Sequence, residues 1–252
     1  MDPHTEMILS VIQNNDIDTF RQILRNPFFA RNYILNIRWS PLPEPNQQDA
    51  GCTVAHFIAS GASGQITDDD AAQFLIALAH HIPDPAQRTA FFNIINDRRE
   101  TTAAWACAWG GHPICLQLLI SYGVDFEFPD EEGVTPTCIC AELGNINCLL
   151  ILRQHGCNMA HRTNDNKTPA YFAAEHGHEL CLRLICDTAA HQLTDRLVLC
   201  GQPDSYGWTP AWVAASNGHL GCLQILQQTG CHMCIADNFG VSPVYAAAEH
   251  GH

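Results

Sequence analysis

Apolar residues recur at helical spacing in short segments of this chain, and most of these segments come in pairs. In TPAYFAAEHGHELCLRLI, residues 168–185, small residues lead to Gly177, and a stripe of Leu, Ile and Cys follows. The same order returns in TPAWVAASNGHLGCLQIL, residues 209–226. Threonine before a helix caps its first backbone amides, and the proline that follows has no amide N–H that needs a partner. Glycine readily adopts the left-handed backbone conformation that ends a helix. The pattern therefore predicts pairs of short α-helices.

The start signal of these pairs repeats at a nearly constant interval. Thr102, Thr135 and Thr168 are 33 residues apart, Thr209 follows after 41, and Ser242 after another 33. Repetition at this period indicates a solenoid, in which each unit buries the apolar face of its neighbour. The sequence thus predicts an all-α solenoid of stacked helix pairs, with short β-hairpin or turn connections and a concave groove.

The connecting segments carry a second repeated pattern, Asp-x-x-Gly-x-Thr/Ser-Pro, at residues 130–136, 204–210 and 237–243. With the 33-residue period, this pattern resembles the ankyrin-repeat family, strongly from about 97 to 252 and more weakly from 48 to 82. The family usually has histidine two residues after the proline, and here only His56 keeps it. The resemblance implies a solenoid that binds other proteins, in which the histidine of the repeated Gly-His pair is structural.

The repeat alignment divides the chain into seven expected segments. These are a helical cap with an irregular linker at 1–47, a divergent repeat with insertions at 48–96, repeats at 97–129, 130–162, 163–203 and 204–236, and a partial repeat at 237–252. Within the first two segments we expect two short helices split at residues 14–16, and further helices at about 69–81 and 86–92. Insertions at 60–68, 83–95 and 187–203 are expected on one face of the solenoid, as candidate contact points. The partial repeat lacks a second helix, so we expect a truncated chain.

Charge and hydropathy narrow the class of partner. The formal net charge is −14 and the pI about 5.3, and such a surface repels nucleic acid and anionic membranes. The chain shows neither an apolar run long enough to span a membrane nor a recognisable signal peptide. We therefore expect a cytoplasmic monomer. Divergent, cysteine-rich ankyrin copies also resemble effectors that intracellular bacteria deliver into host cells, which would place the protein in a host cytoplasm.

Thirteen cysteines and fourteen histidines raise the question of metal chemistry. Cys115, Cys148, Cys181 and Cys222 occupy one position in successive units. Stacked helices lie about 8–10 Å apart, which is too far for four thiolates to share one zinc ion. We expect these cysteines to be small core residues, and we expect free thiols in a reducing compartment.

The sequence shows no catalytic signature. It contains no phosphate loop, no Gly-x-Ser-x-Gly and no His-Glu-x-x-His, and its single local Cys-x-x-Cys, at 231–234, has no second pair nearby. We expect no enzyme activity, no cofactor and no bound metal. Three alternatives stay open: a targeting module of a larger enzyme whose catalytic domain lies beyond residue 252, a Cys–His nucleophile pair formed in space, and a thiol or metal site in the insertions, for example Cys200 with His191.

The exposed positions of the repeat supply the expected binding surface. In ankyrin-like stacks, partners touch the hairpin tips and the exposed end of the first helix, and aromatic residues and arginine dominate binding hot spots. The partner-binding residues implied by the resemblance are Arg98, Arg99, Trp109, Glu131, Glu132, Glu142, Leu143, Asp165, Lys167, His176, Tyr206, Trp208, Asn217, Asn238, Phe239 and Val241. An acidic patch is expected from Glu127, Asp130, Glu131, Glu132 and Glu142.

These residues predict a non-catalytic scaffold that binds a protein or peptide partner with a basic patch. We expect Trp208 and Phe239 to act in binding without supporting the stack. We expect Leu118, in the apolar stripe of the 97–129 repeat, to be buried in the core.

Overall fold

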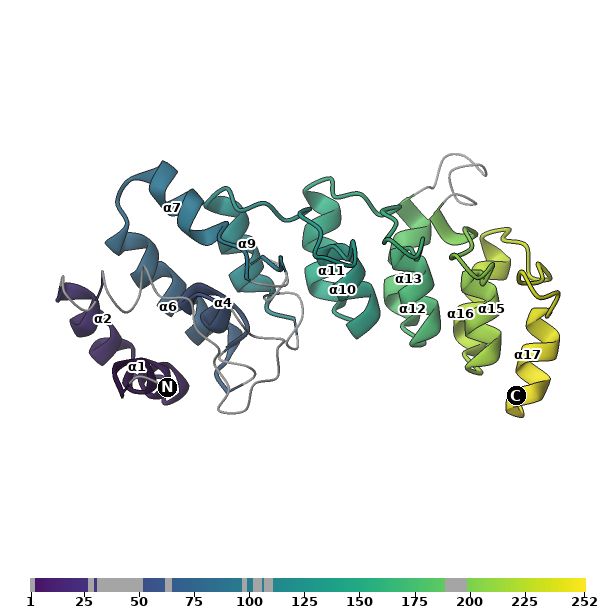
Figure 1. Ribbon diagram of the computed structural model, residues 1–252, viewed down its shortest axis with the longest axis horizontal. Coiled ribbons are helices and arrows are strands. Elements are labelled where there is room, and N and C mark those ends of the chain that lie inside the picture. Colours follow the sequence, from purple (N-terminus) through teal and green to yellow (C-terminus); the bar gives the residue numbers. More distant parts are fainter. Residues whose placement is uncertain are drawn as a thin grey trace. The chain divides into compact units, whose positions relative to one another are not determined.

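The computed structural model describes residues 3–26, 30, 52–61, 65–96, 99–101, 106, 111–188 and 199–252. The chain forms two compact units, unit 1 (Met1–Glu131) and unit 2 (Glu132–His252). Within the described residues the regular elements are α-helices and no β-strand occurs (Figure 1). The predicted all-α fold is therefore confirmed.

Unit 1 is built around helix α6. Its helices are α1 (Pro3–Gln13), α2 (Ile17–Arg25), α4 (Val54–Ala59), α6 (Asp68–His81), α7 (Pro85–Phe92) and α9 (Pro113–Ser121). Helices α2, α4 and α9 pack against α6, and the rings of Phe20 and Phe74 meet edge to face with centroids 5.1 Å apart. Between α1 and α2, Asn15 is left-handed (φ 56°) and the Asp16 carboxylate accepts the Thr19 amide at 3.0 Å. The expected helices and the split at residues 14–16 are confirmed.

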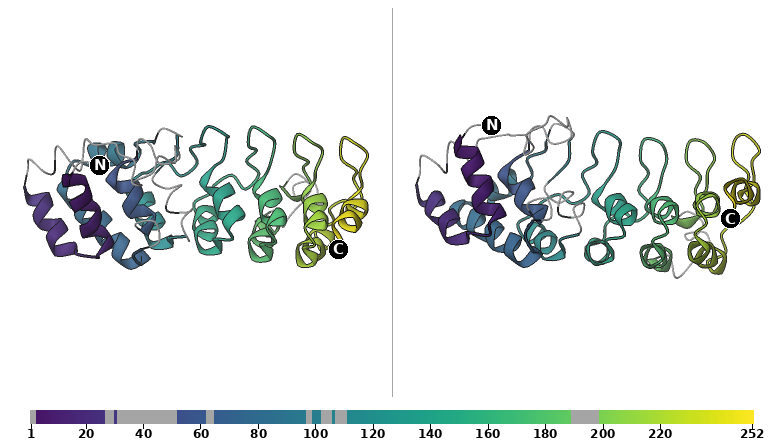
Figure 2. Two further views of the ribbon diagram at one scale, coloured as in Figure 1. Left: turned by 60° about the horizontal axis from the view of Figure 1, so that its bottom comes forward. Right: turned by 90° about the horizontal axis from the view of Figure 1, so that it is seen from below.

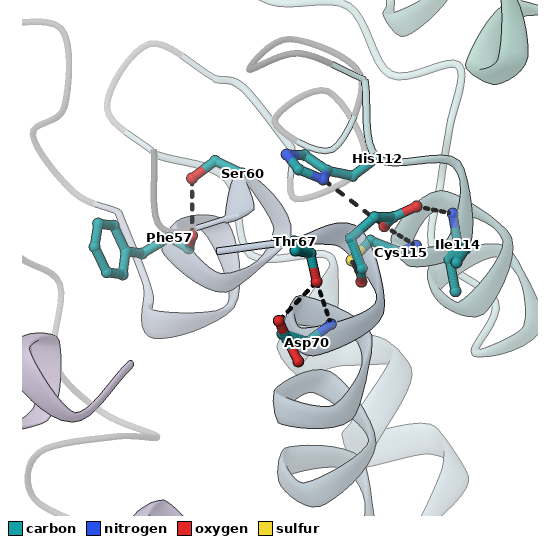
Figure 3. Close-up of polar contacts among 8 residues, drawn as sticks. Phe57, Ser60, Thr67, Asp70, His112, Ile114 and Cys115 are labelled. Carbon is teal, nitrogen blue, oxygen red and sulfur yellow. Dashed lines mark hydrogen bonds and ion pairs between the residues drawn. The ribbon is translucent and has the colours of Figure 1, made fainter. Parts of the chain in front are cut away.

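The first turn of α6 also caps helix α9. At the start of α6, the Thr67 hydroxyl donates to the Asp70 carboxylate at 2.7 Å, and this bond lowers the pKa of Asp70. The neighbouring Asp68 carboxylate instead reaches α9, where its two oxygens accept the amides of Ile114 at 2.7 Å and Cys115 at 3.0 Å (Figure 3). The first amides of a helix have no partner within that helix and carry its positive end. Asp68 therefore completes α9 from a different helix.

Replacing Asp68 with asparagine is expected to lower the stability of unit 1 by about 2 kcal/mol, because a hydrogen bond to a charged acceptor contributes about 1.5–3 kcal/mol. The asparagine has one accepting oxygen where two amides need acceptors. The midpoint of urea unfolding measures the effect. Asp69→Asn is the matched control, because Asp69 is an exposed carboxylate in the same first turn. Equal midpoints for the two variants would contradict the role of Asp68.

Unit 2 is a row of helix pairs. Its helices are α10 (Pro136–Leu143), α11 (Ile146–Gln154), α12 (Pro169–Glu175), α13 (Glu179–Thr188), α15 (Pro210–Ser216), α16 (Leu220–Gln228) and α17 (Pro243–His250). The first helices pack in the order α10, α12, α15, α17, and the second helices in the order α11, α13, α16. Each first helix begins at a Thr or Ser cap followed by proline, as predicted. Figure 2 shows the connections before the first helices projecting on one side of this row.

Hydrogen bonds join these projecting connections to one another. We call their turn residues fingers: 132–134, 163–167, 204–208 and 237–241. One backbone amide of each later finger donates to a carbonyl of the finger before it: Asn164 to Glu132 (3.0 Å), Ser205 to Asp165 (2.9 Å) and Asn238 to Tyr206 (3.0 Å). Within its own finger, the Asp204 carboxylate accepts the amides of Tyr206 and Trp208, both at 2.9 Å. The fingers therefore form a bonded row.

The glycine after the first helix of a repeat lies against a histidine of the next repeat. Gly144 ends α10 with a left-handed backbone (φ 74°), and a Cβ atom added there would lie 2.5 Å from Nδ1 of His178 in the following repeat. The same relation joins the glycine of each later repeat to a histidine: Gly177 to His219, and Gly218 to His252. The structural role expected for these histidines is confirmed. Each ring packs against a glycine of the preceding repeat, where a larger residue would collide with it.

The cysteine ladder lies in the core, as predicted. Cys115, Cys148, Cys181 and Cys222 are each at most 1% exposed. Burial raises the pKa of the Cys181 and Cys222 thiols to about 11, so both are protonated at neutral pH. A protonated, enclosed thiol is a poor nucleophile and a poor metal ligand. No group of three potential metal ligands occurs among the described residues.

The prediction that Leu118 is buried is wrong. Leu118 of α9 is partly exposed, whereas Leu116 and Leu119 of the same helix are fully enclosed. The buried face of α9 is the stripe formed by Cys115, Leu116 and Leu119, and Leu118 lies at its margin.

The prediction of free thiols is wrong for two cysteines. Cys186, near the end of α13, and Cys200 form a disulfide with their Cα atoms 6.2 Å apart. The physical reason is that Cys200 lies beside the end of α13, where the two side chains meet. Ten other described cysteines are free, and of these only Cys234 is exposed. His191, the partner considered for Cys200, lies outside the described residues.

Candidate protein-binding cleft

A cleft of about 360 Å³ lies between the first two fingers of unit 2 and the ends of α10 and α12. Its lining consists of Glu132, Val134, Glu142, Thr163, Asp165, Lys167, Phe172, Glu175 and His176. We call it the acidic cleft. It brings together five of the residues proposed from the sequence: Glu132, Glu142, Asp165, Lys167 and His176.

Four carboxylates and one lysine set the charge of the acidic cleft. The Lys167 ammonium lies 3.9 Å from a Glu175 carboxylate oxygen, and both side chains are 26% exposed. The ammonium also lies 4.9 Å from the centroid of the Tyr171 ring, within the range of a cation–π contact. Lys167 therefore offsets Glu175, and the acidic side chains of the lining outnumber its single lysine.

Two aromatic side chains of α12, Phe172 and Tyr171, lie at or next to the acidic cleft. Phe172 lines it and is only 7% exposed, while Tyr171 beside it is fully buried. Burial, followed by the neighbouring carboxylates of Glu175 and Asp204, raises the pKa of Tyr171 far above its ordinary value. Tyr171 therefore stays neutral beside Phe172, which is one of the two apolar side chains in the lining, with Val134.

Aromatic residues of the last two fingers divide into exposed and supporting ones. Phe239 is 77% exposed and Tyr206 is 52% exposed. By contrast, the Trp208 ring stacks on Trp212 with centroids 4.8 Å apart, and its indole N–H donates to Asp237 at 3.1 Å. The expectation that Trp208 acts in binding alone is therefore corrected, because this side chain also ties two repeats together.

Three further positions proposed for binding make contacts between repeats. The Asn217 amide donates to the Glu175 carbonyl at 2.8 Å, and the Asn238 amide donates to the Ser205 carbonyl at 3.1 Å. The Val241 carbonyl accepts the indole N–H of Trp212 at 3.1 Å. Trp212 stands where the family usually has histidine, so this indole supplies one of the loop hydrogen bonds. Leu143, at the end of α10, is 49% exposed.

The remaining predicted residues belong to unit 1. Arg99 is exposed and left-handed (φ 65°), with its guanidinium 5.2 Å from the Phe128 ring centroid. Glu131 is exposed. Arg98 and Trp109 lie outside the described residues. Of the five residues in the expected acidic patch, the acidic cleft contains Glu132 and Glu142.

Comparison with protein families decides the classification. A family model described as ankyrin repeats (3 copies) matches residues 62–162 and 103–196, and an ankyrin-repeat model matches residues 206–238. The chain belongs to the ankyrin-repeat family. Ankyrin repeats are protein–protein interaction modules. A search of curated proteins finds no match for this ankyrin-repeat chain. No helix in the described parts of the chain has both the length and the apolar character needed to cross a membrane.

Sequence reasoning did not single out Thr163 and Phe172 as lining residues of the ankyrin cleft. The signal available for Phe172 is side-chain volume, since the same position holds Ile139, Val213 and Ala246 in other copies. The larger ring lines this cleft in one copy only. The sequence gives no such signal for Thr163. A threonine there is already explained by the turn, in which its hydroxyl accepts the Lys167 amide at 3.1 Å.

Proposed function

We propose that this ankyrin-repeat protein is a non-catalytic scaffold that binds an arginine-containing segment of a partner protein in the acidic cleft. The observation that supports the proposal is that Glu132, Glu142 and Asp165 line one cleft together with Phe172. Several carboxylates beside an apolar side chain match the chemistry of a cationic side chain with an aliphatic stem.

Arginine fits this arrangement better than lysine. Its guanidinium donates paired hydrogen bonds to carboxylates and stacks on aromatic faces, whereas an ammonium acts as a point charge. The cleft volume of about 360 Å³ accommodates such a side chain with adjoining backbone. Charge complementarity of this kind also speeds the encounter of partners and is weakened by salt.

Removing two carboxylates from the acidic cleft is expected to weaken binding of an arginine-rich peptide about tenfold, from the lost charge-assisted hydrogen bonds. The variant is Glu142→Gln with Asp165→Asn, and the probe is a fluorescein-labelled nonapeptide of alternating arginine and glycine. Fluorescence anisotropy at fixed ionic strength gives the Kd.

The matched control is Asp187→Asn with Glu249→Gln. It removes the same charge from exposed positions of unit 2 outside the cleft. We expect it to change the Kd less than twofold at 150 mM salt, where exposed charges beyond about 8 Å are screened. An equal loss in both variants would show that only net charge matters and would refute the cleft as the binding site.

Two finer hypotheses from the sequence stay predictions. One is delivery of the protein into a host cell, for which a translocation assay with a reporter fusion is the direct test. The other is a role as the targeting module of a larger enzyme. Sequencing the native transcript past the codon for His252 tests it, because a stop codon there would remove the alternative.

A further inference from the structure

A second cleft, of about 260 Å³, lies in unit 1 between α2 and α6. These two helices pack against each other (Figure 1). The cleft is lined by Arg21, Leu24, Arg25, Ala77, His80 and His81. We call it the cationic cleft, because every polar residue in its lining is an arginine or a histidine. We propose that it binds a phosphate group carried by a peptide segment of a partner protein.

Local helix chemistry explains why basic residues stand at these places. Arg25 lies in the last turn of α2, and His80 and His81 lie in the last turn of α6. Cationic side chains at a helix C-terminus interact favourably with the negative end of the helix dipole. The dipole does not account for the convergence of two helix ends on one hollow with the buried Leu24 in its lining.

The charges of the cationic cleft are largely uncompensated. Arg21 lies 3.4 Å from the Asp18 carboxylate, but the two side chains are 49% and 84% exposed, and such surface pairs contribute little. Among the described residues, the side chains of Arg25, His80 and His81 have neither a hydrogen-bond nor an ion-pair partner. An anion entering the cleft therefore meets donors that are ready to bind it, in a chain whose formal net charge is −14.

Phosphate matches this set of donors better than carboxylate does. Arginine presents a planar fork that pairs with two oxygens at once, and an imidazole keeps an N–H donor in either protonation state. A phosphate monoester offers three oxygens and nearly two negative charges, whereas a carboxylate offers two oxygens and one charge. A nucleic acid would bring many phosphates against an acidic protein and be repelled, while one phosphate on a peptide is governed by the local field.

The test uses the full chain and three pentapeptides, Gly-Gly-phosphoserine-Gly-Gly and its serine and glutamate analogues. Ring signals of the histidines are followed by NMR during titration at pH 7. The phosphopeptide is expected to shift the signals of His80 and His81 in a saturable way and to leave His155 of unit 2 unmoved. We expect the serine peptide to cause no shift and the glutamate peptide to bind at least tenfold more weakly.

Variants of the arginines complete the test. Arg25→Gln is expected to weaken phosphopeptide binding at least tenfold, and Arg25→Lys less, because the charge remains but the fork is lost. The control Arg183→Gln removes an exposed arginine from α13 of unit 2 and is expected to leave the Kd unchanged. Arg25 is exposed and its interaction with the helix end is weak, so the thermal midpoint of the variant should fall only slightly below that of the wild type.

Three results would overturn the proposal: shifts of equal size with the serine peptide, binding of the glutamate peptide as tight as that of the phosphopeptide, or an unchanged Kd in Arg25→Gln. The inference does not rest on the acidic cleft, which belongs to the other unit. Its failure would leave the function proposed for that cleft untouched.

Discussion

Replacing Leu149 with alanine is expected to lower the free energy of unfolding of unit 2 by about 2–5 kcal/mol, the cost of removing a fully buried leucine side chain. Leu149 is 0% exposed and lies on α11, which packs against α13. Each helix pair packs against the next pair, so the resulting cavity weakens both the repeat itself and its interface with the neighbouring repeat. The shift of the urea unfolding midpoint, multiplied by the slope of the transition, measures the loss.

The neighbouring leucine is the control. Leu150 is 41% exposed on the same helix, so Leu150→Ala removes the same atoms from a largely hydrated position. We expect its cost to stay below about 1 kcal/mol. If the two substitutions cost the same, the packing of α11 against its neighbours is not as described.

Reducing the Cys186–Cys200 disulfide is expected to destabilise unit 2 by about 3 kcal/mol. The bond joins residues 14 positions apart, and closing a loop of about this length removes chain entropy worth about 3 kcal/mol from the unfolded state. Urea unfolding with and without a phosphine reductant gives the difference. Both cysteines are at most 1% exposed, so the reduced chain also has to enclose two thiols at this place.

The double variant Cys186→Ala with Cys200→Ala serves as the reference for this experiment. We expect its unfolding midpoint to be insensitive to the reductant, because its other described cysteines are free. A reductant effect of the same size in the wild type and in this variant would assign the effect to another source, and the disulfide would then make no contribution to stability.

Those parts of the fold that depend on residues close together in sequence could be predicted. The Thr-Pro start at Thr168, the left-handed glycine at Gly177 and the buried Cys181 each follow from local rules applied within one repeat. The helical period also located α6 and α7 within one residue of their bounds. Repetition strengthened these predictions, since the same rule could be checked in several copies.

Contacts that differ from copy to copy could not be predicted. Asp68 caps a helix that begins 45 positions later, and nothing in its neighbourhood in the sequence distinguishes it from Asp69. The Cys186–Cys200 bond joins two of thirteen cysteines, and no local rule selects this pair. The acidic cleft depends on the ring of Phe172, whose position is filled by smaller residues in the other copies. These features depend on side chains from different elements meeting in space, which the period of the repeat does not specify.

The contact between each Gly and the following His has a consequence for engineering by repeat exchange. The ring of His178 occupies the space that a side chain at Gly144 would fill, and His219 does the same at Gly177. Neighbouring repeats therefore fit together only when the glycine and the histidine are both present. A foreign repeat inserted between two native ones therefore needs two residues. It needs a glycine that leaves room for the histidine of the following repeat, and a histidine that packs on the glycine of the preceding repeat. A chimera that keeps only one of these two halves has either a collision or a void at its new junction.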